Sequence, residues 1–409
     1  MARKPPSKSS STPAKGKPVG PLLAESAPSA TAADRAGMRR PPGRLADVVG
    51  QARAVTALSR AMALSRLHHA WIFHGPPGVG KFTAATAFAA AIMDPTTRVD
   101  PTSGLPEADP AGRVRRLCDS GNHPDLHIIT KELARYSDDP RIRVGKQITI
   151  AKDVIERHLI HPAGLAPTVT PGGLATKVFI VDEAELLDRS PFNAPTQNSL
   201  LKTLEEPPPG TVIILVTSAE DRLLPTIRSR CQRVGFGRLD PESMNEWMRR
   251  AGVVLPAESA AWLLEYADGS PGDLLKSLAT GIDRWRARIG PMLDRIDRGE
   301  PCAELGGAMA ELIDAEAERL AKASPHASKE ASNKVAADSM FRLVADHLRR
   351  GLRCAAVAAP PADRPVRARI KCLELLVEAE RHVDSNVQAI FACSNLAAQL
   401  GVVLSSARS

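Results

Sequence analysis

Residues 70–93, AWIFHGPPGVGKFTAATAFAAAIM, constrain the fold more than any other stretch of this chain. An apolar run with strand character leads into a glycine-rich loop, and an alanine-rich helix opens where the loop ends. Gly75, Gly78 and Gly80 let backbone N–H groups turn inward, and the start of the helix adds the positive end of its dipole. A strand, such a loop and a helix in this order predict a phosphate-binding loop.

The loop departs from the pattern G-x-x-x-x-G-K-[ST] at one position. Lys81 is placed to reach the β- and γ-phosphates of ATP or ADP, but Phe82 follows where a hydroxyl would bind Mg²⁺. Thr83 comes one residue late, and a helical rotation of about 100° points it elsewhere. Two interpretations stay open: competent hydrolysis, or a structural relic that binds nucleotide weakly or not at all. The predicted nucleotide contacts are Gly75, Pro76, Pro77, Gly78, Val79, Gly80, Lys81, Phe82 and Thr83.

Acidic and hydroxyl side chains follow two other predicted strands. The apolar run in VFIVDEAE ends at Asp182 and Glu183, a pair suited to metal contact and activation of water. The alternative is an acidic strand end that faces solvent. The run TVIILVTS ends at Thr217 and Ser218, which we take as sensor-like positions.

Apolar strands alternate with helices up to about residue 237, which predicts an α/β domain whose parallel sheet is covered on both faces. Beyond it the strand signals stop, and the remaining segments are all-α. Residues 94–122 are polar and rich in proline and glycine, so we expect a loop. The expected parts are a disordered basic tail, a core domain, a helical lid and a helical C-terminal domain, over residues 1–42, 43–237, 238–284 and 285–409.

Composition bounds the partners. The net charge of +8 lies mostly in residues 1–44, so the folded body is not a strongly basic nucleic-acid binder. The tail is expected to be solvated or to contact DNA or an acidic partner loosely. We see no apolar run of about 18–20 residues and no secretory signal, and therefore expect a cytoplasmic protein without a membrane partner. The six cysteines include no C-x-x-C pair and the histidines lack ligand spacing, so no metal, zinc included, is expected.

The stretch LLPTIRSRC places Arg230 in a turn or short helix after the strand that ends at Thr217. A lone arginine is usually a surface or salt-bridge residue. In a chain with a phosphate loop, the sharper hypothesis is an arginine finger offered to the γ-phosphate held by a neighbouring subunit. Arg228 and Arg233 are alternatives for that role.

Together these stretches resemble the bacterial clamp loaders of the AAA+ class. DVVGQ, GPPGVGK, VFIVDEAE, LLKTLEEPP, LLPTIRSRC and DGSPGD occur in that family's order over residues 45–275, and LLKTLEEPP followed by SRC is the most specific pairing. The resemblance implies a P-loop AAA+ parallel αβα sheet domain, a small helical lid and an all-helical collar that serves oligomerisation. It also implies that Asp182 and Glu183 match the family's Walker B pair, and that Arg230 is the trans arginine finger.

Two departures make the chain similar to the delta-prime type of clamp-loader subunit. Motor subunits of the family carry Thr after the loop lysine and commonly an arginine in the lid, whereas this chain has Phe82 and the sequence GSPGD. GNHPDLHII also looks like delta-prime, although only Cys118 matches the four zinc-binding cysteines found there. The resemblance implies a hetero-pentameric ring with delta and gamma/tau subunits, acting on a sliding clamp and primed DNA at the replisome.

Three functions remain open at this point. The first is a clamp-loader subunit that supplies Arg230 in trans and does not hydrolyse ATP itself. The second is an active AAA+ ATPase motor of the gamma/tau kind or another AAA+ remodeller, against which Phe82 and the arginine-free lid count. The third is a small-molecule kinase, which the SRC motif and the helical C-terminus disfavour.

Overall fold

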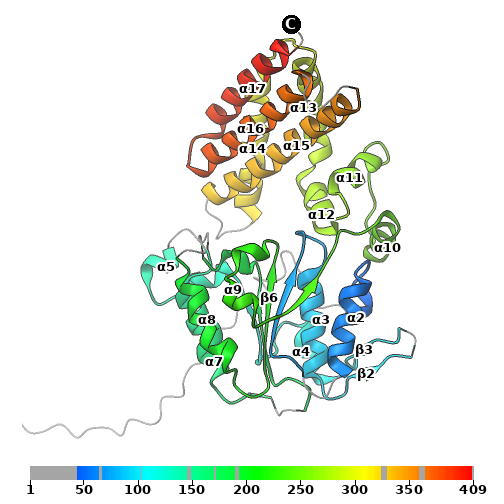
Figure 1. The fold of residues 1–409 in the computed structure, drawn as a ribbon, viewed down its shortest axis with the longest axis vertical. Coiled ribbons are helices and arrows are strands. Elements are labelled where there is room, and N and C mark those ends of the chain that lie inside the picture. The colour runs from blue at the N-terminus through cyan, green and yellow to red at the C-terminus, as the bar shows by residue number, and fades with distance from the viewer. Residues whose placement is uncertain are drawn as a thin grey trace, which may run out of the picture.

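The structure consists of a parallel sheet covered by helices and an elongated helical region that lies next to it (Figure 1). The computed structural model describes residues 44–63, 67–101, 103–144, 149–169, 172–188, 193–323, 329–358 and 364–407. The tail predicted over residues 1–42 lies outside the described residues.

The sheet has five strands in the described part of the chain, and all of its strand pairs are parallel. In spatial order the strands are β4 (Leu126–Ile129), β5 (Lys177–Val181), β6 (Thr211–Thr217), β1 (Ala70–His74) and β7 (Gln232–Gly235). The three central strands are almost entirely buried, which explains their continuous apolar sequences. His74 pairs with Thr217, so the phosphate loop begins level with the end of β6.

Side chains alternate along the strands, and the sheet therefore packs on two separate cores. Trp71 and Ile214 belong to one core, and Ile72 and Leu215 to the other. Helices on the first face are α2 (Ala52–Ala63), α3 (Lys81–Met93) and α4 (Arg113–Asp119). Elements on the second face are η2 (Lys131–Tyr136), α6 (Lys152–Ile155), η3 (Glu156–Ile160), α7 (His161–Ala163), α8 (Pro195–Glu205) and α9 (Pro225–Arg228).

The segment 94–122 is more structured than a loop. It contains a short hairpin of β2 (Arg98–Val99) and β3 (Pro106–Glu107), followed by α4. Val114 and Cys118, four residues apart, point into the core from α4. The loop expectation was wrong there because arginines and turn residues mask a helix with only one apolar row. Short elements elsewhere are η1 (Leu45–Asp47), α5 (Pro140–Val144), η4 (Ala184–Leu186) and η5 (Glu220–Arg222).

The described residues after β7 form helices without strands. The first three lie over the sheet domain as a lid: α10 (Pro241–Ala251), α11 (Ala260–Ala267) and α12 (Pro271–Thr280). The others build the elongated bundle in Figure 1, referred to below as the collar: α13 (Ile282–Asp297), α14 (Glu304–Ala323), α15 (Lys329–Ala358), α16 (Arg364–Asp384) and α17 (Ala389–Ser406).

Helix α17 corrects the expectation that no apolar run is long enough to cross a membrane. By length and composition its 18 residues qualify, with a mean hydropathy of 1.5 and no charged side chain. The helix packs against α14 and α16 along the outer edge of the bundle (Figure 1). Length and composition of this kind are shared by core helices of helical bundles, so they do not by themselves indicate a membrane span.

Candidate functional site

The parallel sheet brings the predicted loop, acids and hydroxyls to one edge. The loop follows β1, Asp182 follows β5, and Ser218 follows β6, and β6 lies between the other two strands. Carboxyl ends of parallel strands meet at one edge, where ligands of open α/β sheets bind. The expected constellation is therefore assembled in space, although its individual side chains point in several directions.

Lys81 turns inward onto its own loop. Its Nζ donates to the carbonyl oxygens of Gly75 at 2.7 Å and Pro76 at 2.5 Å, and to Ser218 Oγ at 3.1 Å. The side chain is buried, and burial lowers the pKa of Lys81 to about 8 although Glu185 and Asp182 act to raise it. The ammonium group is thus held by the loop itself rather than directed outward.

The lid lies directly on the loop. Ser270 Oγ donates to the carbonyl of Pro77 at 3.0 Å, and the Gly272 N–H donates to the carbonyl of Gly78 at 2.9 Å. A Cβ at Gly272 would be 2.6 Å from the Gly78 Cα, so only glycine permits this backbone contact. Ser270 is fully buried and was not identified from the sequence, because only the tertiary structure brings GSPGD onto the loop.

Phe82 and Thr83 occupy the first turn of α3. Phe82 is partly buried and packs against the core on the first face of the sheet, whereas Thr83 is exposed. That Thr83 points away from the position of the missing hydroxyl remains a prediction.

A second residue that sequence reasoning missed is Gln51, whose Nε2 donates to the Val79 carbonyl at 3.3 Å and the Gly237 carbonyl at 2.7 Å.

The acids after β5 divide between two environments. Glu183 has a left-handed φ of 53° and pairs with Lys131 at 2.9 Å near the surface. Glu185 accepts a hydrogen bond from the Ser218 N–H at 3.2 Å, and its Oε2 is buried without a hydrogen-bond partner among the described residues. Glu185 raises the pKa of Lys81 more than Asp182 does, so an acid that the motif did not single out acts most strongly on the loop lysine.

The two sensor-like residues differ. Ser218 is the one that reaches Lys81, while the buried Thr217 uses its Oγ1 to accept from the Ala219 N–H at 3.1 Å. Thr217 therefore supports the turn after β6, and only Ser218 contacts the phosphate-loop lysine.

Arg230 lies near the amino-terminal ends of the parallel strands, whereas the loop lies at their carboxyl-terminal ends. It precedes β7, whose first residue Gln232 is level with Trp71, whereas the loop begins after His74. At about 3.3 Å per residue this separates Arg230 from its own loop by roughly 15 Å along the strand direction. Its side chain is 36% exposed and paired with Glu205, so it is partly open to another molecule.

The alternative arginines are placed differently. Arg233 lies within β7 and donates from NH2 to Glu220 Oε2 at 2.9 Å. Glu220 also contacts His74 Nδ1 at 3.2 Å, which ties Arg233 to the end of β1. Arg228 is partly buried at the end of α9.

The predicted absence of metal ligands among the histidines of the sheet domain remains a prediction. His127 stacks on Phe179 with centroids 4.7 Å apart, and burial, aided by Lys177, lowers the pKa of His127 to about 4. Asp125 is buried and accepts from the N–H groups of Thr168 and Val169. These contacts give the side chains a structural role at the edge of the sheet.

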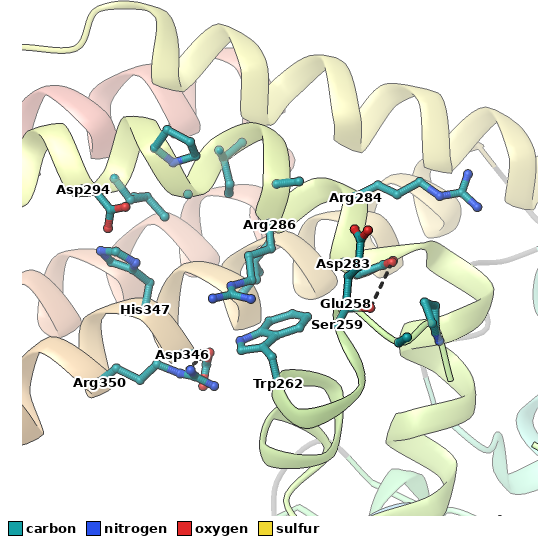
Figure 2. Close-up of a pocket in the computed structure, with 18 residues that line it drawn as sticks. Glu258, Ser259, Trp262, Asp283, Arg284, Arg286, Asp294, Asp346, His347 and Arg350 are labelled. Atoms are coloured by element: carbon teal, nitrogen blue, oxygen red, sulfur yellow. Dashed lines mark hydrogen bonds and ion pairs between the residues drawn. The ribbon is translucent and has the colours of Figure 1, made fainter. Parts of the chain in front are cut away.

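A separate cleft of about 790 Å³ lies between lid and collar, formed by α11, α13 and α15 (Figure 2). Trp262 forms part of its wall beneath the Arg286 guanidinium, 4.7 Å from the ring centroid. Near its other end, Asp294, Asp297 and His347 bring potential ligand atoms within 4.8 Å of one another. His347 and Arg369 both bond Asp297, at 2.9 and 3.2 Å, so these charges are already paired within the protein.

Polar bridges from α15 also hold the lid. Arg342 donates to Asp273 Oδ2 at 2.9 Å and lies over the ring of Tyr266. Asp273 directly follows Gly272, whose N–H bonds the phosphate loop. The loop, the start of α12 and the collar are thus joined by consecutive contacts.

The fold and the site define the class. A phosphate loop after the strand β1, a sheet ordered β4-β5-β6-β1-β7 and a helical lid on the loop are the architecture of an AAA+ protein. The helical collar follows this AAA+ domain.

The sequence matches a family model described as DNA polymerase III, delta subunit, over residues 50–240. It is 31% identical over 244 residues to the DNA polymerase III subunit gamma/tau of Mycobacterium bovis, covering 58% of this chain and 37% of that protein. It is 30% identical over 221 residues to the DNA polymerase III subunit delta' of Pseudomonas aeruginosa, covering 54% of this chain and 59% of that one. The chain thus spans less than two thirds of the length of either relative. Over residues 50–240 the chain is therefore similar to the clamp-loader subunits of bacterial DNA polymerase III, and these matches support a clamp-loader protein of the AAA+ class.

A solved structure, a gamma subunit-related protein from Thermotoga maritima, aligns with 86% of this chain and 99% of that chain, at 17% identity and a TM-score of 0.36.

Proposed function

We propose that this chain is a delta-prime-like subunit of the DNA polymerase III clamp loader, which helps to load the sliding clamp onto primed DNA. In this proposal Arg230 acts in trans on ATP bound by a neighbouring subunit, and the chain does not hydrolyse ATP itself. Its partners are delta and gamma/tau subunits in a hetero-pentameric ring located in the cytoplasm at the replisome.

The observation that carries the proposal is the position of Arg230. Its partly exposed side chain lies beside the amino-terminal end of β7, whereas the chain's own phosphate loop lies at the carboxyl-terminal ends of the strands. An arginine there cannot serve the nucleotide of its own chain, but it is available to a nucleotide held by an adjacent subunit. An arginine supplied in trans accelerates phosphoryl transfer by about 10³–10⁵ in well-studied enzymes.

The state of the chain's own loop supports the second part. Lys81 bonds two loop carbonyls, Ser270 and Gly272 bond two more, and Phe82 replaces the Mg²⁺ ligand. To bind a phosphate of ATP or ADP, the Lys81 ammonium would have to leave these carbonyls, and Mg²⁺ would lack its hydroxyl ligand. Zinc is not part of the proposal, because Cys118 is a single buried thiol whose pKa burial raises to about 12.

A second candidate is an active motor subunit of the gamma/tau kind. Two observations favour it: similarity to gamma/tau proteins over 58% of the chain, and the acids Asp182 and Glu183 at the end of β5. Tight Mg²⁺-ATP binding with turnover by the full chain alone would support this candidate over the first.

The test is a ring reconstituted with the clamp-loader subunits of the same organism. Arg230→Ala should strongly reduce DNA-stimulated ATPase activity, whereas the matched control Arg233→Ala, an exposed arginine three residues away, should change it little. Co-elution of both variants with the ring shows that assembly is intact. Normal ATPase activity of an assembled Arg230→Ala ring would refute the proposal.

A further inference from the structure

The two most specific sequence motifs of this chain, LLKTLEEPP and SRC, are in contact in the structure. LLKTLEEPP ends helix α8, and SRC follows α9, more than twenty residues later in the sequence. Glu205 Oε1 of the first motif lies 2.5 Å from the Arg230 NH2 of the second. The function proposed above uses Arg230 and leaves the acid of the first motif unexplained.

Glu205 is at an unfavourable position for an acid. It is the last residue of α8, where the helix dipole presents its negative end and basic side chains are preferred. Glu206 follows it as the C-cap, so two acids stand together there. Residues that break a local rule are expected at functional sites, and the partner of Glu205 is Arg230, the proposed arginine finger.

The guanidinium of Arg230 contacts acceptors of its own chain through two nitrogens. NH1 donates to the Thr226 carbonyl at 2.9 Å, and NH2 bonds Glu205. A planar group fixed at two points has a defined orientation, while guanidinium carries further N–H donors for an incoming oxyanion. The side chain is 36% exposed, so those donors are accessible from outside the chain.

We propose that Glu205 is a positioning residue that, together with the Thr226 carbonyl, orients the Arg230 guanidinium toward the triphosphate of a neighbouring subunit. This inference rests on the proposed trans role of Arg230. Glu205 itself does not touch the nucleotide. Because this pair already restricts the rotamers of Arg230, less side-chain entropy has to be lost when the guanidinium binds the triphosphate.

The test uses Glu205→Ala, Glu205→Gln and Arg230→Ala, alone and combined, in the reconstituted ring. The control is Glu206→Ala, the neighbouring exposed acid at the same helix end. Glu205→Ala should lower the kcat of the DNA-stimulated ATPase roughly two- to fivefold, the size expected for a solvent-exposed ion pair, with the KM for ATP unchanged. Glu205→Gln should recover part of the loss, because its amide oxygen still accepts a hydrogen bond.

Glu205→Ala should have no further effect in the Arg230→Ala background, which is the signature of action through Arg230 alone. An equal fractional loss in that background would mean a structural role and overturn the inference. An unchanged or increased kcat for Glu205→Ala alone would also overturn it. These outcomes are distinct from failure of the proposed function, which would appear as normal activity of Arg230→Ala.

Discussion

The contact between lid and phosphate loop makes a sharp prediction for Gly272→Ala. Gly272 is a helical residue with an ordinary φ, so alanine alone would favour the helix by up to about 1 kcal/mol. The new Cβ would meet the Gly78 Cα at 2.6 Å and the Gly78 oxygen at 3.2 Å. Both are backbone atoms that cannot rotate away, so the start of α12 must move off the loop.

The expected cost follows from these contacts. Overpacking of this kind costs about 1–3 kcal/mol, and losing the Gly272 N–H bond to Gly78 adds about 0.5–1.5 kcal/mol. After the gain in helix propensity, the net destabilisation is about 0.5–3.5 kcal/mol. For a cooperative unit of about 150–250 residues, each kcal/mol lowers Tm by about 2–4 °C.

The assay combines thermal unfolding with amide hydrogen exchange of the peptide that contains the loop. Gly272→Ala should lower Tm and speed exchange in residues 75–83. The control is Gly401→Ala in α17, where a Cβ meets nothing within 4 Å and the substitution should be neutral or stabilising. If Gly272→Ala were as stable as the control and exchange in the loop were unchanged, the lid would not rest on the loop as described.

Two more predictions concern pH and the collar. The pKa of His127 is about 4 in the folded chain against a reference value of 6.5 in the unfolded chain, so the unfolded state takes up the proton first as pH falls, and stability declines from about pH 6.5 to about pH 4. His127→Phe keeps an aromatic ring on Phe179 and should flatten Tm over this pH range; an unchanged profile would contradict the assignment. Arg342→Ala removes the bridge from the collar to Asp273 and should speed hydrogen exchange in α12, whereas the exposed Arg349→Ala should not. Equal exchange in the two variants would show that the bridge does not hold the lid.

Local patterns predicted much of the sheet domain, because each signal needed only neighbouring residues. The strand, loop and helix around Gly75–Lys81 and the apolar strands 177–181 and 211–217 are where the patterns placed them. The helix α4 was missed because arginines surround a single apolar row. The length of α17 was missed because serine, asparagine and glutamine interrupt an otherwise uncharged run.

The site was predicted as a set of positions, without their mutual contacts. Nothing near Ser270 in the sequence indicates that its hydroxyl bonds the Pro77 carbonyl, and the VDEAE motif gives no reason to prefer Glu185 over Asp182 as the stronger influence on Lys81. Such contacts join segments separated by many residues, and they depend on packing between whole elements.

The sequence by itself determined the phosphate loop, the order of strands and helices, and the presence of an arginine after the strand β6, because these follow from residue type and short-range periodicity. Only the tertiary structure decided that the lid covers the loop and that Arg230 lies beside Glu205, at the ends of the strands away from the loop. The reason is that the order of the parallel strands and the direction of α8 decide which ends of helices and strands lie close together. Neither property is encoded in any one segment.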